Sequence, residues 1–222
     1  MSPYTINANR QTIPNVGQNR TMSLKIPVAH DFSCPWCYIA LFQIDKLKRD
    51  FDVDIEWLGY ELWPEDLDWP ESPPPREIFN KPPVPSRLQL MLAAENMELP
   101  QVERPKRMRT HFVHLASEYA KEHGRADLFI PEVYRAYWER GEFINEPEIL
   151  CHIGEQVGLD PVDMQKSTES EAFADRIGQF DVPAYKAGVF NVPTFFIGGE
   201  RYAEQPYRVL EQAVAQATRE LP

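Results

Sequence analysis

The chain has 222 residues, 43% of them hydrophobic, which is enough for one compact unit with a substantial core and an elaboration. Its formal net charge of -11 and its pI of about 5.0 oppose binding to polyphosphate backbones and anionic lipids, so neither nucleic acid nor a membrane is an expected partner. No apolar stretch reaches the length of about 18 residues that a membrane-spanning helix needs. The polar segment 1–22 lacks the apolar stretch of a secretory signal, so we expect a flexible N-terminal tail and a cytoplasmic protein.

The first predicted elements are a strand, a helix and a second strand. Residues 24–30 have the alternation of a short strand, and from Pro35 onward apolar side chains recur at helical spacing. Proline suits the first position of a helix, because its missing N–H would have no intrahelical partner there. Residues 53–58 alternate apolar and acidic side chains and stop before Gly59, which predicts a second strand and hence a βαβ unit.

The middle of the chain is predicted to be helical. A proline-rich connector is expected at 65–85, because its proline runs exclude a helix or a central strand. Helical patterns then extend through 86–170, where one helix ends near Gly124 and the next carries Pro131 close to its start. Asn145 and Asp160 each precede a proline and an acidic residue, a pattern typical of a capped helix start.

The last third returns to strands. Residues 192–197 form an apolar, β-rich run, Gly198-Gly199 is a hairpin signal, and a final helix begins near Pro206. The order βαβ, helical block, ββα predicts an α/β fold. One domain would consist of residues 23–64 and 171–222, with an all-helical subdomain inserted at 86–170.

Cys34 and Cys37 form a Cys-x-x-Cys pair where the first helix begins. Unsatisfied N–H groups and the helix dipole favour negative charge on the first sulfur, so Cys34 is the expected nucleophile. Cys37 lies nearly one turn later, where it can attack a mixed disulfide formed by Cys34, and it is the expected resolving thiol. Pro35 fixes the turn and Trp36 adds an apolar surface, so we expect both to contact the substrate.

Other uses of these residues are weaker interpretations. Three cysteines and five histidines allow no four-cysteine zinc site, and no histidine pair has the spacing of a zinc finger, so we expect no metal and no organic cofactor. Asp31 and His30 either influence the thiols or are surface and capping residues. Cys151 is interpreted as a small buried core residue. Arg109 and His111 are interpreted as surface or core residues, and the aromatic residues Tyr137, Trp138 and Phe143 are interpreted as core residues.

Val192-Pro193-Thr194 is a second signal, late in the chain. It places a proline at the opening of a strand, where a cis peptide bond would point the Val192 backbone toward a neighbouring loop. A Cys-x-x-Cys helix early and such a hairpin late is the order of the thioredoxin fold. The chain resembles the DsbA-like oxidoreductases of the FrnE type over about 24–217, and the matching segments are 31–39, 109–111, 136–141, 158–160 and 188–195.

The resemblance implies a thioredoxin fold with an inserted helical subdomain, a catalytic pair of Cys34 and Cys37, and a substrate-binding loop at Val192 and Pro193. The expected substrates are disulfide- or thiol-containing proteins or small molecules. Related 2-hydroxychromene-2-carboxylate isomerases and kappa-class glutathione transferases have serine at the position of Cys34 and bind glutathione. A glutathione-dependent isomerase or transferase, with glutathione as co-substrate, is therefore one alternative, and a non-catalytic redox-sensing or chaperone-like module is another.

Overall fold

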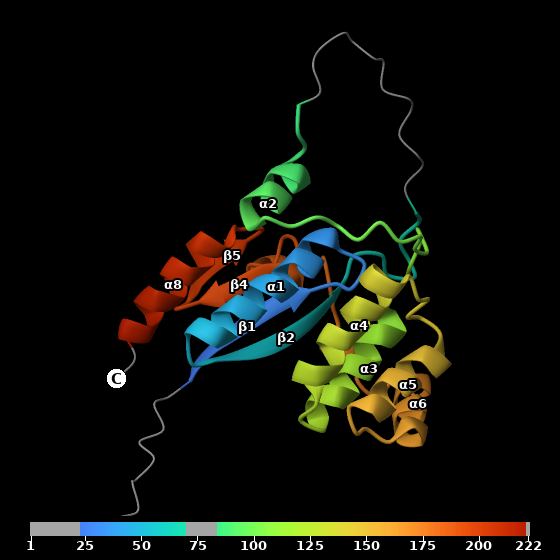
Figure 1. Cartoon of the computed structure of the whole chain (residues 1–222). Helices are drawn as coiled ribbons and strands as arrows, with labels where there is room; N and C mark the ends of the chain where they lie inside the picture. The colour runs from blue at the N-terminus through green and yellow to red at the C-terminus, as the bar shows by residue number, and fades with distance from the viewer. Residues whose placement is uncertain (1–22, 70–83, 221–222) are drawn as a thin grey trace, which may run out of the picture.

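A five-stranded mixed sheet forms the centre of the computed structural model, which describes residues 23–69 and 84–220 (Figure 1). The expected tail at 1–22 and most of the expected connector lie outside the described residues. The sheet has the order β3-β2-β1-β4-β5, in which β1 pairs parallel with β2 and antiparallel with β4. Its strands are β1 (Leu24–His30), β2 (Val53–Glu61), β3 (Gly178–Gln179), β4 (Thr194–Ile197) and β5 (Glu200–Ala203).

The central strand β1 has the bounds that its alternation predicts. β2 runs three residues beyond the predicted end at residue 58, through Gly59. The glycine does not end the strand; it makes room for a side chain from another element, because a Cβ at Gly59 would lie 2.5 Å from His114 Nδ1. The two-residue strand β3, which pairs parallel with β2, was not predicted, because so short an edge strand carries no periodicity of its own.

One helix of the βαβ unit and one helix of the ββα unit pack on this sheet. α1 (Pro35–Asp50) contacts β2, and α8 (Tyr207–Arg219) contacts β1 and β4. The predicted apolar face of α8 is confirmed, since Leu210, Ala213 and Val214 are all buried. A short helix, α7 (Val182–Lys186), precedes the β4–β5 hairpin, whose turn at Gly198-Gly199 is also confirmed. This βαβ and ββα arrangement is the thioredoxin fold.

Four helices form a bundle beside the sheet, on the side away from α8 (Figure 1). Pro131 lies inside the second of these helices, α4 (Ala126–Arg140), without ending it. The Asp160 side chain caps a helix as predicted, by accepting from the N–H groups of Val162 and Asp163. The predicted cap at Asn145 is wrong, because Glu146 is the N-cap there and makes no side-chain capping bond. The bundle helices are α3 (His111–Glu122), α4 (Ala126–Arg140), α5 (Pro147–Gln156) and α6 (Pro161–Glu169).

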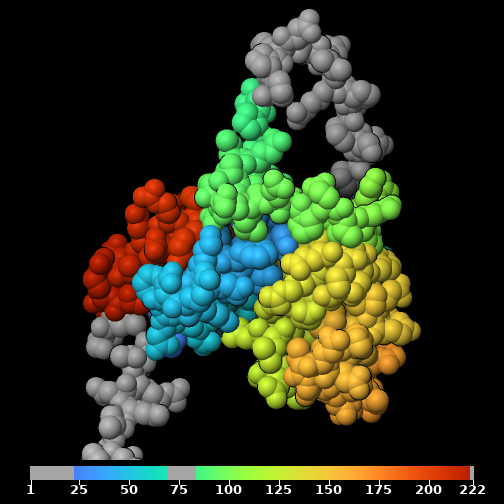
Figure 2. Space-filling view, in the orientation of Figure 1, coloured from blue at the N-terminus to red at the C-terminus, as the bar shows by residue number. Residues whose placement is uncertain are grey.

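The helix α2 (Arg87–Glu95) falls in the range expected for the inserted subdomain, but its polar contacts lead to α1 and α8. Figure 2 shows its surface over that of α1, apart from the four-helix bundle. The buried Glu95 carboxylate accepts from Gln43 Nε2 at 2.8 Å, from Lys46 Nζ at 3.0 Å and from the Tyr207 N–H at 2.6 Å. One carboxylate thus ties three helices together.

Glu95→Ala is expected to loosen α2 selectively. Hydrogen bonds to a charged group contribute about 1.5–3 kcal/mol, so the free energy of local opening of α2 should fall by about that amount. Hydrogen–deuterium exchange should therefore speed up in α2 while α3–α6 stay unchanged. Glu98→Ala, which removes an exposed carboxylate three residues later, is the control and should leave both regions as they are. Equal exchange of α2 in the two variants would contradict this role of Glu95.

Candidate active site

The two cysteines of the motif lie in the first turn of α1. Cys34 is the N-cap of the helix and Pro35 is its first residue, as the sequence predicts. The N–H groups of Cys37 and Tyr38 both donate to the Cys34 carbonyl at 3.1 Å, which closes the turn. Both cysteines are free thiols, and their exposed fractions are only 5% and 2%. The pair is therefore held rigidly at the edge of the core.

The loop before β4 covers Cys34. The Val192–Pro193 peptide bond is cis, and Cys34 Sγ donates to the Val192 carbonyl oxygen at 3.4 Å. Thr194 Oγ1 donates to the Asn191 carbonyl at 2.7 Å, so the loop is fastened on both sides of the proline. The fold thus brings Cys34 against Val192 and Pro193, 158 residues later in the chain.

Trp36, between the two cysteines, is half-buried and faces α2. The Arg87 guanidinium lies 5.5 Å from the centre of its ring. The indole also lines an open pocket of about 270 Å³ together with Leu90, Met91 and Pro206. The expected substrate-contacting residue therefore borders a largely apolar surface.

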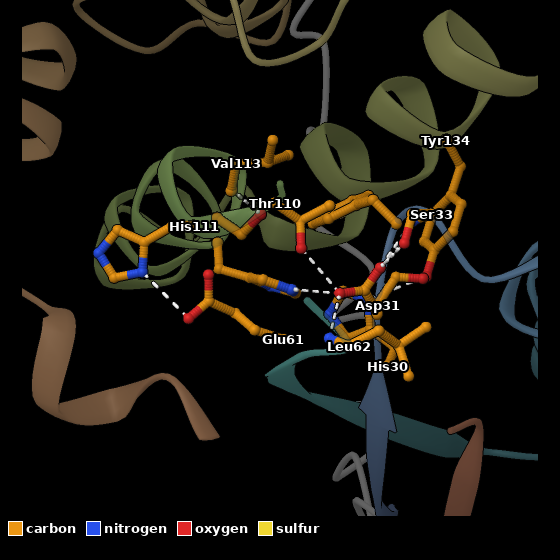
Figure 3. A network of polar contacts seen from close by, with 12 residues as sticks. His30, Asp31, Ser33, Glu61, Leu62, Thr110, His111, Val113 and Tyr134 are labelled. Atoms are coloured by element: carbon orange, nitrogen blue, oxygen red, sulfur yellow. Dashed lines mark hydrogen bonds and ion pairs between the residues drawn. The ribbon is translucent and has the colours of Figure 1, made fainter. Parts of the chain in front are cut away.

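A fully buried carboxylate, that of Asp31, lies just after β1 and three residues before Cys34, and Figure 3 shows its polar contacts. Asp31 Oδ1 accepts from the Ser33 N–H at 2.7 Å and from Ser33 Oγ at 2.5 Å. Its Oδ2 accepts from Thr110 Oγ1 at 2.7 Å and from the Leu62 N–H at 3.1 Å, while His114 Nε2 lies 3.7 Å away. The interpretation of Asp31 as a surface residue is therefore wrong, because groups from three separate segments of the chain surround it.

The groups around Asp31 favour the ionised form of its carboxylate. Burial raises the pKa of Asp31, but the nearby imidazole of His114 and the hydroxyls of Ser33 and Thr110 outweigh it, so the net pKa is lowered. Asp31 is thus an ionised group inside the core. Its neighbour His30 is also buried, and burial followed by repulsion from His114 lowers the pKa of His30 well below its usual value. His30 is therefore neutral at pH 7.

The inserted bundle reaches this site through α4. The Tyr134 hydroxyl donates to the Asp31 carbonyl at 3.1 Å and lies 3.0 Å from His30 Nδ1. Trp138 Nε1 donates to the Phe32 carbonyl at 2.9 Å, and its ring stacks on that of Tyr38. Sequence reasoning missed Tyr134, although a tyrosine on an apolar helix face signals that its hydroxyl needs a buried partner.

The environment of the Cys37 thiol disfavours its ionisation. Burial, followed by the hydrogen bond and charge of Cys34, raises the pKa of Cys37 well above its usual value, while the Asp31 backbone N–H opposes this increase. Tyr134 is perturbed in the same direction, since burial and the nearby Cys37 raise its pKa. Forming a thiolate at Cys37 is therefore unfavourable in this environment.

The other candidates from the sequence lie apart from the pair. Arg109 binds the carbonyl groups of Trp63, Pro64 and Leu67, so it fastens the segment after β2. His111 Nδ1 lies 3.3 Å from Glu61 Oε2, and this hydrogen bond raises its pKa. Cys151 is half-buried rather than buried, and its Sγ donates to the Pro161 carbonyl. The interpretation of Phe143 as a core residue is wrong, because its side chain is exposed.

The described residues offer neither a metal-binding cluster nor a membrane-spanning helix. Residues 23–69 and 84–220 contain no group of three or more His, Cys, Asp or Glu side chains placed to hold a metal ion. In the same part of the chain, every helix is too short or too polar to cross a membrane.

A model of the DSBA-like thioredoxin domain matches residues 25–215. The chain belongs to this DsbA-like family. A probable DsbA oxidoreductase from Streptomyces coelicolor has a similar structure, with a TM-score of 0.66 and 23% identity over 89% of this chain and 91% of that one. At this identity the likeness supports the fold alone.

Two sequence relatives accompany the DsbA-like family match. The uncharacterized protein YwbO of Bacillus subtilis is 28% identical over 184 residues, which cover 80% of this chain and 88% of YwbO. A 2-hydroxychromene-2-carboxylate isomerase of Pseudomonas sp. (strain C18) is 24% identical over 189 residues, which cover 84% of this chain and 88% of the isomerase. The relatives of this DsbA-like protein thus include both oxidoreductases and isomerases.

Proposed function

We propose that this DsbA-like protein is a thiol–disulfide oxidoreductase, with Cys34 as nucleophile and Cys37 as resolving thiol. The observation that carries the proposal is the position of Cys34 at the N-cap of α1, with Cys37 in the same turn. The Val192 carbonyl oxygen lies 3.4 Å from the Cys34 sulfur. A helix N-terminus stabilises a thiolate, and a second cysteine one turn later completes a dithiol–disulfide couple.

The reaction proceeds through a mixed disulfide. The Cys34 thiolate attacks one sulfur of a substrate disulfide, and the other substrate sulfur leaves as a thiolate. Cys37 then loses its proton and attacks Cys34 Sγ, which releases the second substrate sulfur. The substrate gains two electrons and two protons, and the pair becomes a disulfide. Run in reverse, the same steps oxidise a substrate dithiol.

Val192 supplies the backbone contact for the substrate. In the thiol form its carbonyl accepts the S–H of Cys34. When Cys34 loses that proton, the carbonyl becomes free to accept an N–H from an extended substrate segment, as in strand addition. We expect Pro35, Trp36 and Pro193 to contact the same substrate segment, and no metal or organic cofactor takes part in the proposed reaction.

The proposal is tested by an insulin-disulfide reduction assay and a dithiol-peptide oxidation assay. Wild-type protein should turn over in at least one of them, and Cys151→Ser should match it, because Cys151 lies in the bundle away from the pair. Exchange limited to one equivalent per chain would favour a redox-sensing module. Undiminished turnover in Cys34→Ser would refute the proposed role of the pair.

The isomerase relative supports a second candidate, a glutathione-dependent isomerase or transferase on the same fold. It predicts saturable binding of glutathione and a turnover that survives loss of Cys37, since glutathione itself would supply the working thiol. Titration of the wild type and of Cys37→Ser with glutathione separates the two functions. The presence of a thiol at Cys34 favours dithiol–disulfide exchange, because the isomerases that the chain resembles have serine there.

A further inference from the structure

Glu204 is an unusual residue directly after β5. Its φ angle of 49° is in the left-handed region, which residues other than glycine rarely adopt. Its side chain is only 14% exposed, although glutamate is normally a surface residue. A strained backbone persists only where the surrounding contacts hold it, and such positions concentrate at functional sites.

The contacts of Glu204 hold the loop before β4 on both sides of Val192. The Glu204 N–H donates to the Pro193 carbonyl at 3.2 Å, which continues the β4–β5 pairing. Its Oε1 accepts from Asn191 Nδ2 at 2.8 Å. Because Asn191 and Pro193 flank Val192, these two hydrogen bonds fix the carbonyl that faces Cys34 Sγ.

The segment that carries Glu204 is itself fastened to α1, the helix that Cys34 caps. Gln43 of α1 is buried, and its Nε2 donates to the Gln205 carbonyl at 3.0 Å. The loop and the nucleophile are thus tied to the same helix, the loop through Glu204 and Gln205. This connection sets the position of Val192 relative to Cys34.

The second carboxylate oxygen of Glu204 reaches α2, which lies close to the end of β5 (Figure 1). Glu204 Oε2 accepts from Arg87 Nη2 at 2.6 Å, and the Arg87 guanidinium lies 5.5 Å from the centre of the Trp36 ring. Arg87 is exposed, so this ion pair adds little to the free energy of unfolding. Its effect is positional, because it keeps the guanidinium beside the tryptophan that separates the two cysteines.

We propose that Glu204 is a positioning residue, which holds the Val192 carbonyl where an extended peptide disulfide pairs with it. The inference rests on the proposed exchange reaction and names peptide disulfides as its substrate class. A carbonyl fixed in this way recognises the N–H groups of an extended peptide backbone. A small disulfide without such groups reacts with Cys34 without using the loop, so its reaction depends little on Glu204.

Glu204→Ala is expected to raise the KM for a disulfide peptide about tenfold and to change kcat by about twofold at most, because the loop that binds the peptide loses hydrogen bonds to a charged group. With hydroxyethyl disulfide, the rate should also change by about twofold at most. Glu171→Ala is the matched control. Glu171 has a similar φ angle of 51°, but it is exposed and lies just after α6, so its variant should match the wild type with both substrates.

A double-mutant cycle tests the contact between Asn191 and Glu204. Asn191→Ala removes the partner of Oε1 but leaves the Glu204 carboxylate and its ion pair with Arg87 in place. The KM of the double variant should therefore be no higher than that of Glu204→Ala alone. If the two effects multiplied, the residues would act independently, and the proposed hold on the loop would be overturned.

A second variant covers the case in which Glu204→Ala does not fold. Glu204→Gly relieves the left-handed backbone and removes the same carboxylate, so it should fold and show the same rise in KM for the peptide. A wild-type KM in folded Glu204→Gly, or equal losses with the peptide and with hydroxyethyl disulfide, would overturn the role of Glu204. Wild-type turnover of hydroxyethyl disulfide but not of the peptide would overturn the substrate class. If the wild type exchanges with neither substrate, the proposed function itself fails.

Discussion

Cys34→Ser is expected to lower disulfide-exchange turnover roughly a thousandfold or more, whereas Cys37→Ser is expected to stop the reaction at a mixed disulfide. A serine hydroxyl does not attack a disulfide at neutral pH, so the first variant cannot begin the reaction. The second variant keeps the nucleophile at the N-cap of α1 but lacks the sulfur that lies in the same helical turn. The two substitutions therefore block successive steps.

Mass spectrometry after reaction with a disulfide peptide distinguishes the two blocks. Cys37→Ser should carry one peptide per chain, released by added dithiol, and Cys34→Ser should carry little at early times. Cys151→Ser should carry almost none at steady state, because its intact pair resolves the adduct. If Cys37 in the Cys34→Ser protein bound peptide as fast as Cys34 does in the Cys37→Ser protein, the assignment of Cys34 as the nucleophile would be wrong.

The elements that the sequence predicts well are those whose pattern is local. β1 and the β4–β5 hairpin have alternation and turn residues within a few positions, and the Asp160 cap needs only its next three residues. β3 and the docking of α2 have no such local signal. β3 exists because β2 offers it an edge, and α2 is held by Glu95 through partners 49 to 112 residues away.

The same distinction applies to the candidate site. The Cys34–Cys37 spacing and the Val192–Pro193 position could be predicted because each motif is contiguous. The burial of Asp31 could not, since its donors come from Ser33, Leu62 and Thr110, and only the folded chain brings these together. Tyr134 was missed for the same reason, because its partners are about 100 residues away.

Asp31→Asn is expected to lower the free energy of unfolding at pH 7 by about 3–5 kcal/mol, the usual cost of breaking a buried charge pair. An amide resembles a carboxylate in shape but has one acceptor oxygen and one donor nitrogen. Whichever way it turns, the NH₂ group meets donors, either the N–H and hydroxyl of Ser33 or the groups from Leu62 and Thr110. Two buried donors therefore lose their acceptor.

The effect of this substitution should depend on pH in a defined direction. The folded pKa of Asp31 lies below the unfolded value of about 3.9, so its ionised form stabilises the fold fully above that value. As the pH falls through the lower folded pKa, the wild type loses this contribution. The difference between wild type and Asp31→Asn should therefore be largest near neutral pH and should shrink in acid.

Urea unfolding of both proteins at neutral pH and at about pH 3 measures that difference. The exposed Asp45 on α1 provides the control, because Asp45→Asn removes one carboxylate without removing a buried acceptor and should change the unfolding free energy little at either pH. A difference for Asp31→Asn that stays constant between the two pH values would mean that shape, rather than charge, holds this site together. Because the Asp31 carbonyl also accepts from the Cys34 N–H and from the Tyr134 hydroxyl, loss of the side-chain charge at neutral pH should weaken the same region that positions the cysteine pair.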